Sequence, residues 1–350
     1  MKVALFDVIN EAHVCTSLAE ALEAQGHRVH CTGRVWRGHR RATVATDMAR
    51  IDSAVDSVLA EGCEALLNFR AGALSPRQLD RLRRAGVRTA VWLPDDPVLY
   101  ATTYGPVVDA YDHVLHCGPA SVLRFYDTKG HAPGVSFPFW LGTREWPWQW
   151  RHETATQGLV FLGNLHGPAK RGRYGVLALA AGRITVYGNC PEDPHGIHRG
   201  ELHGADALRA VLPGFAAGIN LPQRFADYLG TPYDFDGLAG LGSFDLPSRV
   251  LQYAAVGLPV ITLASQGPSA HFAPALHAMD MSNALEVLDR LQQDPDAATE
   301  LSIRARAVVE AHFSADVRAR FLVDLFRGAL RPRDMDLAQR EYAYQAYQGS

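Results

Sequence analysis

The sequence lacks several features that would assign it to a specialised class of protein. It contains no apolar run of about 18 residues, so we expect no transmembrane helix. Its N-terminus, MKVALFDVINEAH, reaches acidic and polar residues too early for a secretory signal peptide, and we expect a cytoplasmic protein. The 5 cysteines are scattered and form no CxxC pair, so the sequence predicts neither a zinc knuckle nor a disulfide scaffold.

Neither sign of charge dominates the composition. The chain has 34 Lys and Arg against 37 Asp and Glu, a formal net charge of −3, which gives no overall argument for binding nucleic acid. Hydrophobic residues make up 47% of the 350 residues and charged residues 20%, as in ordinary globular proteins. Because a domain usually has roughly 100–200 residues, this length predicts two domains.

Both halves of the chain repeat one pattern of short strands that alternate with helices. Strands are expected at 3–6, 28–31, 65–68, 87–93, 112–116, 134–137, 158–162, 184–187, 217–221 and 259–263. Helices are expected from about 12 and 174, and at 46–60, 76–85, 205–212, 248–256, 284–293, 297–312 and 315–327. This alternation predicts parallel sheets with helices on both faces.

We therefore predict an α/β protein with two doubly wound, Rossmann-like domains that face each other across a cleft. The expected boundaries are 1–140 for the first domain and 158–331 for the second, with a linker at 141–157. The tryptophans of this irregular stretch are expected to pack at the domain junction. Open parallel sheets bind ligands outside the carboxyl ends of their strands, so the loops after the strands should carry the function.

A glycine and a group of basic residues follow the first strand of the second domain. Gly163 and Asn164 come directly after the strand, and Lys170, Arg171 and Arg173 lie around the start of the next helix. Backbone N–H groups at a helix N-terminus and arginine side chains both bind phosphate. The segment predicts a phosphate-binding loop, although it has neither the P-loop nor the GxGxxG spacing. The alternative is a solvated basic loop.

A second polar group stands at the start of the helix expected at 248–256. Ser248 lies at its N-terminus, where a phosphate or ribose could be bound. Arg249 and Gln252 are three residues apart and share one face of the helix. The alternative is an amphipathic helix with two exposed polar residues.

The segment 247–261 resembles the P-x-R-x-x-E-x-x-A-x-G-x-P-V-I element of sugar-nucleotide-dependent glycosyltransferases with the GT-B fold. Other segments resemble this family in their order and spacing: WLPDDP at 92–97, YDHVLHC at 111–117, FLGN at 161–164, VYG at 186–188 and INL at 219–221. The similarity is greatest to the spore-maturation CgeB-like branch. The family usually has Glu at the position of Gln252, and glutamine lacks the charge that strengthens hydrogen bonds to ribose hydroxyls.

The resemblance implies that the second domain binds a nucleoside diphosphate sugar, with a UDP-sugar as the expected donor and neither metal nor other cofactor. The donor residues that it implies are Gly163, Asn164, Arg171, Arg173, Ser248 and Arg249 for the diphosphate, Tyr187 and Gly188 for the nucleobase, and Gln252 for the ribose, with Asn220 ending a further strand on the same side. It also implies that a C-terminal helix at 332–350 crosses back to the first domain.

The first domain would then bind a hydroxyl-bearing acceptor, which is a small molecule, a glycan or modified DNA. Transfer needs a general base. The candidates follow the predicted strands: Glu11 and His13 after the first, Asp95 and Asp96 after the fourth, with Asp7, Asn10 and Arg70 as further polar residues nearby. Adjacent carboxylates before a proline point in different directions, so we expect no metal-binding DxD motif there.

Two polar loops in the second half remain. The loop at 188–204 carries His195, His198 and His203, and we expect a mobile loop over the donor site rather than a zinc site, because a loop interrupted by Gly and Pro gives no evidence of convergent ligands. The stretch 227–240 is expected to be flexible and to form part of the donor rim.

The sequence thus predicts a glycosyltransferase of the EC 2.4 class. A transferase that acts on a hydroxylated DNA base is one alternative, because Arg34, Arg37, Arg40 and Arg41 form a local basic cluster. A non-catalytic protein that binds nucleotide sugars is another, supported by Gln252. An epimerase of the same fold is a weaker one.

Overall fold

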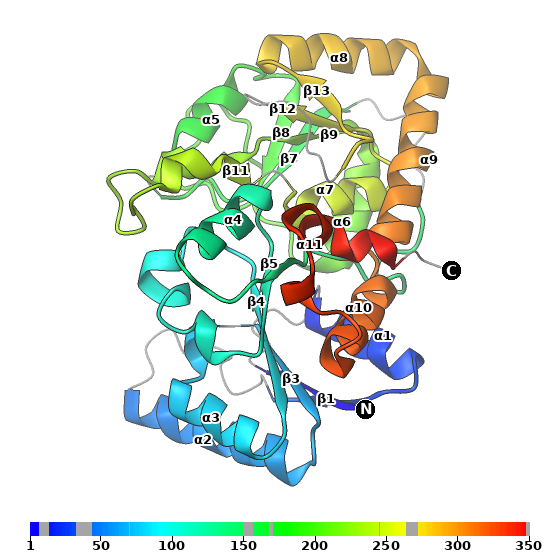
Figure 1. Cartoon of the computed structure of the whole chain (residues 1–350). Coiled ribbons are helices and arrows are strands. Elements are labelled where there is room, and N and C mark those ends of the chain that lie inside the picture. Colours follow the sequence, from blue (N-terminus) through cyan, green and yellow to red (C-terminus); the bar gives the residue numbers. More distant parts are fainter. Residues whose placement is uncertain are drawn as a thin grey trace. The chain divides into compact units, whose positions relative to one another are not determined.

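A computed structural model describes residues 1–6, 14–32, 44–69, 71–149, 157–167, 171–244, 246–263 and 272–347, with the backbone alone for 44–50 and Arg171. The chain divides into two compact units. Unit 1 comprises Met1–Pro138, Tyr233–Leu241 and Ala315–Ser350, and unit 2 comprises Phe139–Pro232 and Gly242–Ser314 (Figure 1).

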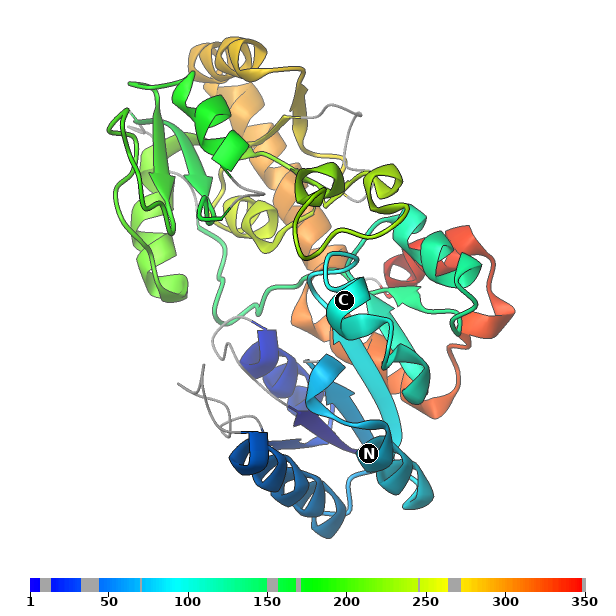
Figure 2. The same cartoon turned by 90° about the vertical axis from the view of Figure 1, so that its left-hand side faces the viewer.

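Unit 1 is built on a parallel six-stranded sheet in the order β2-β1-β3-β4-β5-β6. Its strands are β1 (Lys2–Phe6), β2 (Arg28–Cys31), β3 (Ala65–Asn68), β4 (Arg88–Leu93), β5 (His113–His116) and β6 (Val135–Ser136). Its helices are α1 (Thr16–Ala24), α2 (Val44–Ala60), α3 (Pro76–Arg84), α4 (Ala120–Thr128), α10 (Ala315–Arg327) and α11 (Leu337–Tyr342). Helices α1 and α10 lie side by side, as both views show (Figures 1 and 2).

Local sequence explains why these segments form. Apolar residues make β1 and β3 almost wholly buried, as expected for central strands of a parallel sheet. Helix α3 begins where Ser75 and Gln78 form a capping box and a proline occupies the first turn.

Unit 2 repeats the architecture with a parallel five-stranded sheet in the order β13-β12-β9-β7-β8. Its strands are β7 (Gln157–Leu162), β8 (Ile184–Tyr187), β9 (Phe215–Asn220), β12 (Val260–Leu263) and β13 (Leu276–Ala278), and a separate pair is formed by β10 (Gln223–Arg224) and β11 (Ser243–Phe244). Its helices are α5 (Arg171–Ala178), α6 (Gly204–Val211), α7 (Ser248–Ala255), α8 (Met281–Gln293) and α9 (Pro295–His312).

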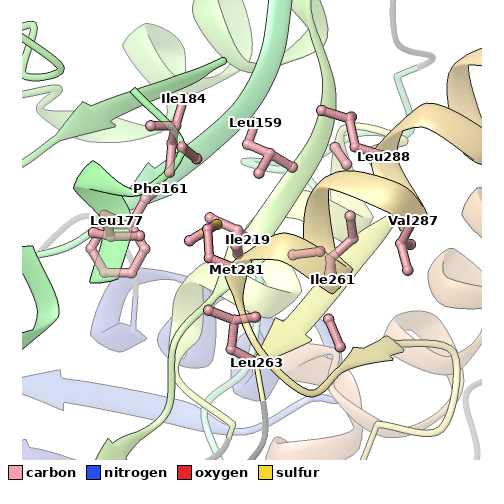
Figure 3. Packing of buried hydrophobic residues seen from close by; sticks show 14 of the residues in the cluster. Leu159, Phe161, Leu177, Ile184, Ile219, Ile261, Leu263, Met281, Val287 and Leu288 are labelled. Carbon is pink, nitrogen blue, oxygen red and sulfur yellow. The ribbon is translucent and has the colours of Figure 1, made fainter. Parts of the chain in front are cut away.

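One face of this sheet carries a core of aliphatic side chains (Figure 3). Leu159, Ile219 and Ile261 from neighbouring strands pack with Met281 and Leu288 of α8. The opposite face receives α7, which contacts β9 and β12. The packing of α7 on this face places its N-terminus near the carboxyl ends of the central strands.

Both sheets have the same strand order, 2-1-3-4-5, with one further strand in unit 1. In this order the direction of strand succession reverses between the first and third strands, and ligands bind outside the carboxyl ends at that point. In unit 2 the reversal lies between β7 and β9. The carboxyl ends of these two strands are therefore the place to examine.

Most strands were predicted correctly, and those at 28–31, 65–68 and 184–187 match the structure at both ends. Helix α4, strand β13 and the pair β10–β11 were missed. The last three segments are only two or three residues long, too short to show a hydrophobic period.

The tryptophan-rich stretch differs from its prediction as a linker. Residues from Phe139 onward belong to unit 2, where Trp140 and Trp146 are 1% and 0% exposed. The Arg306 side chain of α9 donates a hydrogen bond to the Trp146 carbonyl oxygen at 3.2 Å. The stretch from Phe139 onward is therefore part of unit 2 and not a separate linker, while the packing of its tryptophans at the domain junction stays a prediction.

The C-terminal part of the chain also differs from its prediction, which ended the second domain at residue 331. The chain joins unit 1 again at Ala315, ahead of residue 332, because α10 already packs on α1. No helix within the described ranges is long and apolar enough to cross a membrane.

Candidate functional site

The turn after β7 requires glycine at its first position. Gly163 has a φ of +153°, and its N–H donates a hydrogen bond to the Tyr187 carbonyl oxygen at 2.9 Å. A Cβ at this position would lie 3.2 Å from Nη2 of Arg249 and 3.2 Å from the Phe161 ring. Glycine therefore allows the guanidinium group to approach the strand end closely.

The turn after β8 lies directly beside it. Gly188 has a φ of +138°, and a Cβ there would lie 2.3 Å from the Gly163 carbonyl oxygen. The exposed Asn164 side chain accepts a hydrogen bond from the Asn189 N–H at 3.2 Å. The two turns are thereby held together at the carboxyl edge of the sheet.

Two arginines from different helices converge on this edge. Arg173 comes from the first turn of α5 and Arg249 from the first turn of α7. Their guanidinium carbons lie 5.5 Å and 4.9 Å from the centroid of the Phe161 ring. Both distances are within the range of a cation–π interaction.

In the part of the chain that the structure describes, no carboxylate neutralises the arginine pair. Within the described ranges no Asp or Glu lies within ion-pair distance of Arg173 or Arg249. Asp227 acts on Arg173 from farther away and is itself paired with Arg224 at 2.8 Å. Arg173 donates to the Leu221 carbonyl oxygen.

Both arginines have a lowered pKa and a buried N–H donor without a described partner, and the burial of their guanidinium groups accounts for both observations. Burial lowers the pKa of Arg173 to about 9, with Arg249 adding to the effect, and burial also lowers the pKa of Arg249. Nε of Arg173 and Nη1 of Arg249 are buried and have no hydrogen-bond partner among the described residues. Guanidinium groups with buried N–H donors that no described residue satisfies are suited to binding an anion.

Tyr253 holds α7 in the position that this site needs. Its hydroxyl accepts a hydrogen bond from the Leu162 N–H at 2.8 Å and lies 3.4 Å from the Ile219 carbonyl oxygen. A Cβ on Gly218 would lie 2.4 Å from the Tyr253 ring, so glycine is needed there. The helix is thereby fixed over the point where the strand order reverses.

The structure places several predicted donor residues together. Gly163, Gly188, Arg173 and Arg249 meet as described, and Tyr187 takes part through its carbonyl oxygen. The other donor candidates lie at the same edge: Asn220 is fully buried at the end of β9, Ser248 begins α7, and Gln252 lies on α7 with 7% exposure. The side chain of Arg171 is outside the described part of the structure, as is Lys170.

Phe161 and Tyr253 are components that the sequence did not reveal. Both belong to segments quoted for the family resemblance, but an apolar residue in a buried strand or helix looks the same whether or not it supports a site. The alternation of Leu159 and Phe161 placed the ring on a core face, and only its contacts with two arginines distinguish it.

Hydrogen bonds join the histidine loop, for which mobility was predicted, to the rest of unit 2. The Asp193 carboxylate accepts hydrogen bonds from the Tyr174 hydroxyl at 2.7 Å and from the N–H groups of Ile197 and His198 at 2.9 and 3.0 Å. The ring of His198 contacts the Gly188 carbonyl oxygen at 2.7 Å. Across the described residues no three His, Cys, Asp or Glu side chains form a group that could hold a metal.

The stretch expected at the donor rim, 227–240, divides between the units. Its second part, from Tyr233 to Leu241, belongs to unit 1. The Phe235 ring lies 5.3 Å and 5.2 Å from the rings of Tyr100 and Phe125. Aromatic packing therefore holds a segment for which flexibility was expected.

The two candidate carboxylates of unit 1 have different surroundings. Asp95 is exposed, whereas Asp96 is fully buried and accepts hydrogen bonds from His116 Nδ1 at 2.5 Å and the Tyr126 hydroxyl at 2.7 Å. Asp96 thus already uses both carboxylate oxygens in a buried network. The other candidates fall outside the described residues: Glu11, His13, Asp7, Asn10, Arg70 and the cluster of Arg34, Arg37, Arg40 and Arg41.

Comparison with known proteins identifies one family in the second half of the chain. Residues 165–324 match the family described as "Glycosyl transferase-like". This range contains α5, α7 and most of the sheet of unit 2, so it includes Arg173 and Arg249. No curated protein matches the sequence.

Solved structures match nearly the whole chain. A glycosyltransferase from Rickettsia africae ESF-5 has a TM-score of 0.60 at 10% identity, covering 94% of this chain and 98% of that one. A DNA-modifying β-glucosyltransferase, solved with and without uridine diphosphoglucose, has a TM-score of 0.54 at 10% identity, covering 96% and 100%. A protein from Listeria monocytogenes assigned as a UDP-N-acetylglucosamine 2-epimerase has 0.55 at 12%, covering 97% and 98%.

At such low identity these likenesses establish the fold. The chain has the GT-B fold, with two Rossmann-like units, as the sequence predicted. Within it, residues 165–324 are similar to the glycosyl transferase-like family.

Proposed function

We propose that this chain is a glycosyltransferase of the EC 2.4 class that transfers a sugar from a nucleoside diphosphate sugar to a hydroxyl group. The observation that carries this proposal is the pair of buried Arg173 and half-buried Arg249 at the reversal point of the sheet, without a carboxylate among the described residues. A diphosphate supplies the negative charge that such a pair lacks. The match of residues 165–324 to the glycosyl transferase-like family supports the same activity.

The donor would bind in unit 2 with its diphosphate at the two arginines. Glycine at 163 and 188 lets the backbone come close to it, and the N-terminus of α7 at Ser248 adds N–H donors. Tyr187 and Gly188 are proposed to border the nucleobase and Gln252 to bind the ribose, as the resemblance to GT-B glycosyltransferases implies. A UDP-sugar is the proposed donor.

The arginine pair would also assist the chemistry. When the acceptor oxygen attacks the anomeric carbon, the bond from that carbon to the diphosphate oxygen breaks, and negative charge develops on the departing diphosphate. Fixed guanidinium groups aimed at that charge stabilise the transition state. We therefore propose that transfer does not depend on a metal ion.

A general base must take the proton of the acceptor hydroxyl. Asp95 is the proposed base among the described candidates, because it is exposed at the carboxyl end of β4. Glu11 and His13 stay candidates by their position in the sequence. Asp96 is better suited to holding His116 and Tyr126 than to exchanging protons with an acceptor.

The proposal is tested by titrating the protein with UDP, GDP and dTDP and measuring affinity by calorimetry. We expect UDP to bind, and Arg249→Ala to weaken its binding at least about tenfold, because charge-assisted hydrogen bonds are lost. Arg183→Ala is the matched control. Arg183 directly precedes β8 in unit 2, and its charge is paired with Asp289 of α8. Unchanged affinity in Arg249→Ala would refute the assigned site.

Turnover separates the proposal from its alternatives. Release of UDP from a UDP-sugar that depends on an added acceptor supports transfer. Binding of UDP without turnover on a panel of small-molecule, glycan and hydroxymethylated DNA acceptors would instead favour a non-catalytic binding protein, and release of an epimerised sugar would favour an epimerase.

A further inference from the structure

The two guanidinium groups share an uncharged neighbour, the Phe161 ring. It is fully buried at the end of β7, within the apolar cluster that also contains Leu177 (Figure 3). Arg173 and Arg249 lie over this ring at 5.5 Å and 4.9 Å. The negative face of an aromatic ring attracts a cation within about 6 Å.

The shared ring can offset the electrostatic repulsion between the two guanidinium groups. Two positive charges held close together repel each other, and burial strengthens the repulsion. The effect of Arg249 on the pKa of Arg173 reflects that repulsion. A carboxylate could hold both groups, but it would neutralise the charge that an incoming phosphate needs. An aromatic ring attracts both cations and leaves their full charge available to a ligand.

The backbone next to the ring reinforces this role. A Cβ at Gly163 would lie 3.2 Å from the Phe161 ring and 3.2 Å from Nη2 of Arg249. The ring and the guanidinium group thus border the same space above the bare backbone of Gly163, which a side chain there would fill.

We infer that Phe161 is a positioning residue, which keeps the two like-charged guanidinium groups together so that they bind both phosphates of the donor. The inference rests on the proposed function. It assigns Phe161 no contact with the ligand, because the ring acts through Arg173 and Arg249. It predicts that an aromatic residue is required where the core alone would accept any apolar side chain of similar size.

The experiment compares the binding of inorganic pyrophosphate and UDP to three variants by calorimetry. Phe161→Leu keeps an apolar side chain but removes the ring face, so we expect about tenfold weaker binding of both probes. Phe161→Tyr keeps the ring face and should bind both probes more tightly than Phe161→Leu does. Phe215→Leu is the matched control: Phe215 is 1% exposed in β9 of the same sheet, and its ring contact is with Tyr187 at 6.4 Å.

The outcomes separate the two claims. Melting temperatures that fall similarly in both leucine variants, with a loss of pyrophosphate binding that is absent in Phe215→Leu and smaller in Phe161→Tyr than in Phe161→Leu, support positioning. Wild-type affinity in Phe161→Leu, or an equal loss in Phe215→Leu, would overturn the inference and leave the donor site intact. A wild-type protein that binds neither probe would overturn the proposed function as well.

Discussion

At the scale of single residues, the surroundings of Arg173 destabilise its charged form, and a bound anion would remove this destabilisation. Burial and the nearby Arg249 lower its pKa to about 9, so the side chain of the free protein begins to lose its proton in mildly alkaline solution. A bound phosphate favours the charged form and raises the pKa again.

Binding of UDP should therefore take up protons at pH 9 and not at pH 7. At pH 9 part of the free protein carries neutral Arg173, which regains its proton in the complex, whereas at pH 7 the group is already charged. Calorimetry in two buffers of different ionisation enthalpy measures this uptake. Arg173→Gln should abolish it, and uptake that persists in this variant would contradict the assignment.

Asp95 and Asp96 show what residue types and positions can and cannot establish. Both were correctly expected after a strand of unit 1, because strand ends follow from the apolar pattern. Their different environments depend on Tyr126 and His116, which come from α4 and β5 farther along the chain. Contacts between distant segments decide which carboxylate is buried, and no local pattern contains them.

At the scale of elements, the turns after β7 and β8 behave as one structure. Gly188 has no space for a side chain, since a Cβ would lie 2.3 Å from the Gly163 carbonyl oxygen. Short apolar runs predicted both strands, and the sequence also showed a glycine directly after each of them. The contact between the two turns was not, because it follows from the parallel register that pairs Leu162 with Tyr187.

Gly188→Ala should damage both stability and binding. Its positive φ strains alanine, and the contact forces the turns apart, so we expect a loss of about 1–3 kcal/mol in the free energy of unfolding and weaker UDP binding. Chemical denaturation and calorimetry measure the two effects. Gly175→Ala is the control: it lies within α5 with open space around it and should stabilise by about 0.5–1 kcal/mol. Unaltered UDP affinity in Gly188→Ala would contradict the coupling of the turns.

At the scale of the whole molecule, the C-terminal residues are part of the core of unit 1. Tyr344 is fully buried and packs against Arg318, whose guanidinium carbon lies 5.0 Å from the centre of its ring. Arg340 of α11 pairs with Asp127 of α4. A return of the chain was expected from the family resemblance, but the polar composition of this segment gave no indication of such burial.

Tyr344→Ala should destabilise unit 1 by about 3–5 kcal/mol, because a large buried ring is lost. Tyr344→Phe is the control, since it keeps the buried ring and should lose much less stability than Tyr344→Ala. Scanning calorimetry with and without UDP measures the result: UDP should raise the unfolding temperature of unit 2, while Tyr344→Ala lowers that of unit 1. Equal stability of the two tyrosine variants would contradict the prediction.

The chain passes between the two units four times, since Tyr233–Leu241 belongs to unit 1 although unit 2 precedes and follows it. Neither unit is therefore a module that can be cut from the gene as one piece. A fragment covering 139–314 would carry Phe235 without the Tyr100 and Phe125 rings against which it packs. To exchange donor specificity between relatives of this fold, unit 2 would have to be grafted as two segments, Phe139–Pro232 and Gly242–Ser314. The segment Tyr233–Leu241 would be kept from the recipient protein.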